Sequence, residues 1–133
     1  MLWLAISESG ISEPVFFKGG LAVNAQVYNE KCVPVLKNFI EKYHRKQQII
    51  FRPDLASSHY AKSTIENLKN KKIEFVPKEM NPPNVPQLRP IETFWDNLKR
   101  KVYERGYRTK NVDSLILKIK KELESINTEG NIL

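Results

Sequence analysis

Short β-type segments alternate with amphipathic helical segments along most of this 133-residue chain. Residues 2–6 and 15–17 are largely apolar and predict the two strands of a hairpin that turns at Gly10. Residues 49–51 and 73–76 predict two further strands, because they are short and rich in β-branched and aromatic side chains. Strands of this kind separated by helices indicate an α/β fold.

The helical segments are marked by apolar side chains that recur every three or four residues. Asn24 is placed to cap the first helix, which is expected to reach residue 43 with a kink at Pro34. Its apolar stripe consists of Tyr28, Cys32, Val35, Leu36, Phe39, Ile40 and Tyr43. A second helix should begin at Ser57 or Ser58. Its apolar face consists of Ala61, Thr64, Ile65 and Leu68.

A proline-rich loop over residues 77–90 leads from the last expected strand to two terminal helices. These helices are expected over residues 91–104 and 112–125, with a break at Gly106. The first of them should pack on the sheet through a stripe of apolar side chains. The stripe consists of Ile91, Phe94, Trp95, Leu98 and Val102.

The composition favours one globular domain over residues 1–133. Apolar residues make up 41% of the chain and charged residues 28%, so a core is feasible at this length. No apolar run approaches the roughly 18 residues that span a bilayer, and the first residues lack the basic leader of a secretion signal. Cys32 is the only cysteine, which excludes an internal disulfide and favours a reducing compartment such as nucleus or cytoplasm.

The net charge of +7 is concentrated near the C-terminus. Residues 98–121 contain nine Lys or Arg and two acidic residues, so this stretch carries the whole excess of positive charge. A basic segment of this kind is a candidate surface for a nucleic-acid backbone. Alternatively, these side chains only solvate the outer faces of two helices. The basic residues are Lys99, Arg100, Lys101, Arg105, Arg108, Lys110, Lys118, Lys120 and Lys121.

Two acidic residues lie at the edges of expected elements. Asp54 follows Pro53 at the end of a strand, and Glu92 lies in the first turn of the helix that Pro90 should begin. Carboxylates in these two positions are typical of a divalent-metal site in an enzyme that cuts nucleic acid. Such chemistry normally uses a third acid from an earlier strand. The acids before Asp54 are Glu8, Glu13, Glu30 and Glu41.

Each candidate also has a purely structural alternative. Asp54 could only cap the helix that follows it, and Glu92 could only favour the positive end of a helix dipole. His59 could face a phosphate or a metal-bound water, or it could be a solvated histidine. The residue types alone leave these alternatives open.

Three segments together resemble the catalytic domain of mariner-superfamily transposases, the cut-and-paste DNA enzymes with an Asp-Asp-Asp or Asp-Asp-Glu site. They are residues 3–7 (Trp-Leu-Ala-Ile-Ser), 54–59 (Asp-Leu-Ala-Ser-Ser-His) and 90–99 (Pro-Ile-Glu-Thr-Phe-Trp-Asp-Asn-Leu-Lys). The resemblance extends over residues 1–126. The 37 residues between Asp54 and Glu92 are within the range that such transposases use, and the combination of motifs is specific.

The resemblance implies an RNase H-like mixed sheet flanked by helices, with Asp54 and Glu92 as catalytic and metal-binding residues. It implies Mg²⁺ or Mn²⁺ as cofactor, DNA and another transposase chain as partners, and a nuclear location, with no small-molecule cofactor and no membrane association. The implied DNA contacts are His59, Lys99, Arg100, Lys101, Arg105 and Arg108. In the family, a strand with the first catalytic Asp precedes the segment at residues 3–7. The chain is therefore expected to be a truncated domain without that first strand.

The leading hypothesis is a fragment or relic of a transposase catalytic domain that binds nucleic acid but is catalytically incomplete. One alternative is a retained DNA-binding or protein-interaction module that uses the basic helices. Another is a metal-dependent nuclease completed by another chain or an upstream segment, so the question of enzymatic activity stays open. Without a central strand, two interior edges would have unpaired backbone groups, and we expect the isolated chain to be marginally stable and unable to cleave DNA.

Overall fold

The computed structural model describes residues 1–17, 23–54, 57–81, 90–106, 108 and 110–129. The chain begins with a hairpin of two antiparallel strand pairs, β1 (Leu2–Trp3) with β4 (Val15–Phe16) and β2 (Ile6–Ser7) with β3 (Gly10–Ile11). The predicted hairpin is thus confirmed. Its turn is made by Glu8 and Ser9, whereas Gly10 already belongs to β3.

The hairpin is divided because its second strand carries one extra residue. Between the two pairs, the first strand has two residues and the second has three. Ser12 bridges this irregularity, since its backbone N–H donates to the Ala5 carbonyl at 2.9 Å and its hydroxyl accepts the Ala5 N–H at 2.8 Å. An extra residue of this kind bends the strand and increases its twist.

The first predicted helix is present as two helices, α1 (Ala25–Lys31) and α2 (Val33–Tyr43). Asn24 caps α1 as predicted, because its side-chain oxygen accepts the Val27 N–H at 2.9 Å. Pro34 lies in the first turn of α2, where the missing N–H of proline leaves no hydrogen bond unmade. The expected kink is therefore a break between two helices.

The two later strands are predicted too long. Residues 49–51 and 73–76 form a single parallel bridge, in which the Phe51 N–H donates to Glu74 O at 2.8 Å and the Val76 N–H donates to Phe51 O at 2.9 Å. Strand propensity describes single segments, whereas a ladder needs partners on its edges. Within the described ranges, no further strand pairs with either segment.

The remaining helices agree with the sequence pattern to within a few residues. A short 3₁₀ turn, η1 (Ser57–His59), precedes α3 (Lys62–Asn70), and η2 (Lys78–Met80) begins the proline-rich loop. Residues 82–89 of that loop lie outside the described residues. The chain continues with α4 (Pro90–Val102), η4 (Glu104–Gly106) and α5 (Val112–Glu129).

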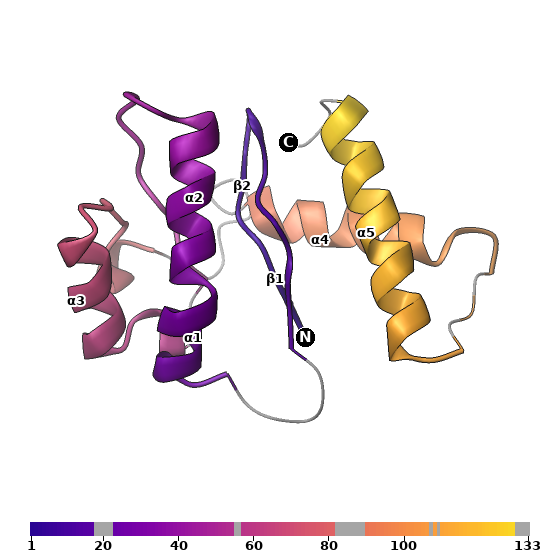
Figure 1. Cartoon of the computed structure of the whole chain (residues 1–133), viewed down its shortest axis with the longest axis horizontal. Coiled ribbons are helices and arrows are strands. Elements are labelled where there is room, and N and C mark those ends of the chain that lie inside the picture. Colours follow the sequence, from indigo (N-terminus) through magenta and orange to yellow (C-terminus); the bar gives the residue numbers. More distant parts are fainter. Residues whose placement is uncertain (18–22, 55–56, 82–89, 107, 109, 130–133) are drawn as a thin grey trace.

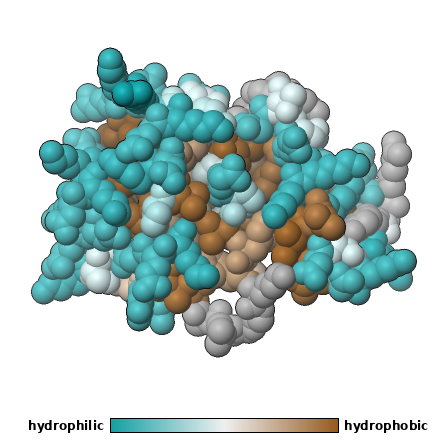
Figure 2. Space-filling model, viewed as in Figure 1, coloured by the Kyte–Doolittle hydropathy of each residue, from teal (hydrophilic) through white to brown (hydrophobic). Residues whose placement is uncertain are grey.

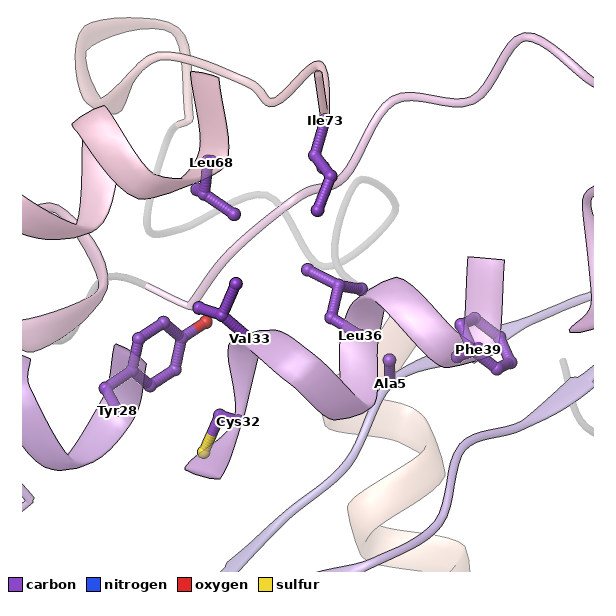
Figure 3. Close-up of a cluster of buried hydrophobic side chains, with 8 residues drawn as sticks. All are labelled: Ala5, Tyr28, Cys32, Val33, Leu36, Phe39, Leu68 and Ile73. Carbon is purple, nitrogen blue, oxygen red and sulfur yellow. The ribbon is translucent and has the colours of Figure 1, made fainter. Parts of the chain in front are cut away.

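The hairpin lies between two groups of helices, with α1, α2 and α3 on one side and α4 and α5 on the other (Figure 1). Because successive strand residues point to opposite faces, neighbouring side chains of the first strand enter different cores. Leu4 packs in a cluster with Phe94 and Leu98 of α4, whereas Ala5 packs against α1 and α2. Figure 3 shows the second cluster, in which Leu68 of α3 also takes part.

The two outer layers are mainly hydrophilic, and hydrophobic side chains are visible between them along the hairpin (Figure 2). The predicted mixed α/β class is confirmed, with small antiparallel pairs and one parallel bridge. The RNase H-like arrangement in detail and the assignment of a single domain stay predictions. None of the helices among the described residues has the length and apolar character needed to cross a membrane.

Candidate metal and nucleic-acid site

Asp54 lies just beyond the parallel bridge, at the carboxyl ends of the two paired segments. Pro53 before it is fully buried, whereas Asp54 itself is exposed. The buried proline anchors the backbone, and the side chain of the next residue, Asp54, is accessible to solvent. Ligands in α/β sheets commonly bind at the carboxyl ends of parallel strands, so Asp54 has a suitable position for a site.

A buried asparagine, Asn81, holds the backbone next to Asp54. Its Nδ2 donates to the Pro53 carbonyl at 2.8 Å and to the Tyr60 hydroxyl at 2.9 Å. Its Oδ1 accepts a hydrogen bond from Arg52 Nη1 at 3.3 Å. Sequence reasoning missed this residue, because an asparagine before two prolines has the appearance of an ordinary turn residue.

His59 is close to Asp54 and half-buried. Its ring stacks on the ring of Tyr28, with centroids 4.2 Å apart and an interplanar angle of 25°. Burial lowers the pKa of His59, an effect opposed by the negative charge of Asp54 and by a hydrogen bond with the Asp54 backbone. The ring is therefore uncharged at neutral pH, which makes it a poor partner for a phosphate; a phosphate contact by His59 stays a prediction.

Two polar atoms of this stacked pair, Tyr28 Oη and His59 Nδ1, are buried and make no hydrogen bond of regular geometry among the described residues. The Trp3 side chain lies close enough to Tyr28, and the Asp54 backbone close enough to His59, to act as weaker partners. Burial also raises the pKa of the Tyr28 hydroxyl well above its usual range, so the hydroxyl stays protonated. The stacked pair is thus neutral at pH 7, and it lies close to Asp54.

Glu92 lies in the first turn of α4, as the sequence predicts, and its side chain is exposed. A neighbouring face of this helix is buried through Phe94, Leu98 and Val102, and Trp95 is half-buried. The predicted packing stripe is therefore confirmed, and it turns Glu92 toward solvent. A separation of roughly 8 Å or less between the Asp54 and Glu92 carboxylates, as one bridging ion requires, stays a prediction.

The basic residues are distributed over α4, the connection after it and α5. Lys99, Arg100 and Arg108 are exposed and Lys101 is half-buried, whereas the Arg105 side chain lies outside the described part. On α5, Lys118 forms an ion pair with Glu122 at 3.1 Å, so not all of the positive charge is available to a ligand. Their role in binding DNA stays a prediction.

The donor chemistry fits a hard divalent cation, because Mg²⁺ and Mn²⁺ prefer carboxylate oxygens and retain water ligands. Asp54 and Glu92 are the two side chains that would hold it. Among the described residues, no group of three or more His, Cys, Asp or Glu is arranged to hold a metal ion. Two carboxylates completed by water form a weaker site than three.

This arrangement, a hairpin and a parallel pair enclosed by helices with an acid at the carboxyl edge, has the fold of a transposase catalytic domain. The crystal structure of the catalytic domain of Mos1 mariner transposase matches it with a TM-score of 0.80 and 21% identity, covering 97% of this chain and 63% of that one. The Mos1 catalytic domain with raltegravir and Mg matches with a TM-score of 0.80 and 21% identity. That match covers 97% of this chain and 64% of the other.

A third structure, the Mos1 catalytic domain with raltegravir and Mn, matches with a TM-score of 0.78 and 20% identity. It covers 97% of this chain and 66% of that chain. This chain therefore spans less than two thirds of the Mos1 catalytic domain, and at this level of identity the similarity establishes the fold. The sequence matches no protein-family model and no curated protein.

Proposed function

We propose that this chain is part of a transposase-type catalytic domain in which Asp54 and Glu92 bind Mg²⁺ or Mn²⁺. The observation that carries the proposal is the position of Asp54. Asp54 is exposed at the carboxyl end of a parallel pair of segments. The fold around it matches the Mos1 catalytic domain over 97% of the present chain. Glu92 adds a second exposed carboxylate at the start of α4.

When bound, a divalent ion would stabilise negative charge on a phosphodiester and favour attack by water or a hydroxyl group. Two neighbouring residues would hold the segment that carries Asp54. Pro53 is buried and fixes the backbone before Asp54, and His59, whose ring is uncharged at neutral pH, is hydrogen-bonded to the Asp54 backbone and would not compete with the metal ion as a cation. The basic residues after Glu92 would bind the phosphate backbone of the DNA substrate.

We further propose that these 133 residues do not cleave DNA by themselves. A two-metal reaction needs a bridging carboxylate in addition to Asp54 and Glu92, and the described residues contain no cluster of three ligands. A third carboxylate would have to come from another chain or from residues outside these 133. Action on chromosomal DNA would place such a protein in the nucleus.

A second candidate is a DNA-binding module without metal chemistry. The specific observation in its favour is the charge distribution, because residues 98–121 carry the whole net charge of +7. Such a module would bind DNA equally well with or without a divalent ion. It would also be insensitive to substitution of Asp54.

Mn²⁺ binding by the 133-residue chain, measured from the loss of the free-ion electron paramagnetic resonance signal, tests the proposal. Asp54→Ala and Glu92→Ala should each weaken binding at least tenfold, whereas Glu66→Ala, which removes an exposed acid of α3, should not. Binding that is the same in the Asp54 and Glu66 variants would refute the metal site. If the chain then still binds DNA, the module without metal chemistry is the better description.

A supercoiled plasmid incubated with the chain in Mg²⁺ or Mn²⁺ tests the second part of the proposal. We expect no nicking above the level of the Asp54→Ala variant. Nicking that requires Asp54 would show that these residues form a working nuclease and would contradict catalytic incompleteness.

A further inference from the structure

Asn81 connects three segments that meet beside the candidate metal site. It is 2% exposed, and its amide hydrogen bonds join Arg52, the Pro53 carbonyl and the Tyr60 hydroxyl. A side-chain amide offers two N–H donors and one oxygen. These three hydrogen bonds use both donors and the acceptor, so the amide is held in one orientation.

The connection continues from Asn81 to the parallel bridge. The Tyr60 hydroxyl, which accepts one Asn81 N–H, donates to the Val76 carbonyl at 2.8 Å. The Val76 N–H in turn donates to the Phe51 carbonyl at 2.9 Å. Asn81 is therefore bonded directly to one segment of the bridge, through Pro53, and indirectly to the other.

The hydrogen bond to Pro53 gives the contacts of Asn81 a consequence for Asp54. Asn81 Nδ2 holds the carbonyl of the residue immediately before Asp54. The amide thus anchors the backbone from which the Asp54 side chain projects.

We propose that Asn81 is a positioning residue for the metal site, which holds the backbone at Pro53 so that the Asp54 carboxylate faces the ion. The inference rests on the proposed metal-binding function. Asn81 itself is buried and would not be a ligand of the ion. Its contribution is made through the hydrogen bond to the Pro53 carbonyl, since a carboxylate on a mobile loop loses the fixed geometry that Mg²⁺ and Mn²⁺ favour.

The test is Mn²⁺ binding by the full 133-residue chain, measured by electron paramagnetic resonance well below the melting temperature of each variant. Asn81→Ala removes the amide, and Asn81→Asp keeps its shape and the acceptor for Arg52 but removes both donors. Each should raise the Mn²⁺ dissociation constant roughly tenfold to a hundredfold, the range observed when groups that orient metal ligands are removed. Asn67→Ala is the matched control, because Asn67 Nδ2 donates to Asn29 between α1 and α3, at 3.0 Å.

The melting temperature, measured on the same samples, separates positioning from a general loss of stability. If Asn81→Ala binds Mn²⁺ as tightly as the wild type while Asp54→Ala does not bind, the positioning role is wrong and the metal site stands. If the wild type shows no binding that depends on Asp54, both the metal site and this inference are wrong.

A further variant keeps the test decisive if both Asn81 variants fail to fold. Tyr60→Phe removes the hydroxyl that accepts one Asn81 N–H but leaves the bond to Pro53 possible. A folded Tyr60→Phe chain should bind Mn²⁺ several-fold more weakly. An unchanged Mn²⁺ affinity would contradict a role for this hydrogen-bonded network.

Discussion

Cys32 lies at the junction of α1 and α2 with a side chain that is 0% exposed. Burial raises the pKa of its thiol to about 12. The reactive form of a cysteine is the thiolate. At pH 8 the thiolate fraction of the native protein should therefore be on the order of a thousandfold below that of an unfolded chain with an ordinary thiol pKa.

We predict that 5,5′-dithiobis(2-nitrobenzoic acid) does not label Cys32 in the native protein at pH 8 but labels it rapidly and stoichiometrically in denaturant. The absorbance of the released thiolate measures both rates. Equal rates in the two conditions would mean that the packing of α1 against α2 is open in solution.

His59 couples folding stability to pH through its lowered pKa. Burial in the stack with Tyr28 favours the neutral ring in the folded state, whereas the unfolded ring titrates near pH 6.5. Because the unfolded chain binds the proton more readily, the free energy of unfolding is fully maintained above pH 6.5 and falls as the pH decreases below it.

We predict that His59→Phe, which preserves the aromatic stack, reduces this loss of stability between pH 7 and pH 5. Urea unfolding at several pH values measures the effect. His44→Gln replaces the other histidine of the chain and should retain the loss of unfolding free energy between pH 7 and pH 5. If His59→Phe leaves the pH dependence of the free energy of unfolding unchanged, other titratable groups cause that dependence.

At the scale of elements, the hairpin is packed against the end of α2 through a glycine. A Cβ atom added at Gly10 would lie 2.5 Å from the Tyr43 ring, which is far closer than such atoms can approach. The tip is also joined to α2 by His44, whose Nε2 lies 2.7 Å from the Ser7 hydroxyl. The side chain at position 10 is therefore limited by the helix that packs on it.

We predict that Gly10→Ala lowers the free energy of unfolding by about 1–3 kcal/mol, the usual cost of overpacking. Denaturant unfolding of the double-mutant cycle with Tyr43→Ala provides the check. In the Tyr43→Ala background the same substitution should cost clearly less, because the clashing ring is gone. Equal costs in both backgrounds would show that the effect arises elsewhere.

At the scale of the whole molecule, the concentration of positive charge predicts DNA binding that depends strongly on salt. Each phosphate contact that releases a counterion adds roughly 0.9 to the slope of log affinity against log salt concentration. Contacts of this type are independent of base sequence. We therefore expect similar affinities for unrelated duplexes.

We predict that a quadruple alanine variant of the basic stretch weakens DNA binding and reduces the salt slope by roughly 2–4. Fluorescence anisotropy at several KCl concentrations measures both quantities. A control variant removes the same charge from exposed residues elsewhere and should keep most of the slope. The test variant replaces Lys99, Arg100, Lys101 and Arg105, and the control replaces Arg45, Lys46, Lys62 and Lys72. If the test and control variants reduce the salt dependence of DNA affinity equally, binding depends on the net charge of the chain and not on the C-terminal helices.

The sequence by itself determined the helices and their boundaries to within a few residues. The cap at Asn24 and the apolar stripe of α4 depend on side chains three or four residues apart, so a local pattern contains the information. The break before Pro34, where a kink within one helix was expected, did not follow from that pattern.

Tertiary structure decided the features that join distant segments. The parallel pairing at Phe51 is a single bridge because its extent depends on neighbouring backbone and not on strand propensity. The stack of His59 on Tyr28 and the hydrogen bonds of Asn81 join residues that are more than 20 positions apart. No periodic pattern records such contacts, because they arise only when packing brings the segments together and burial then requires each polar group to find a partner.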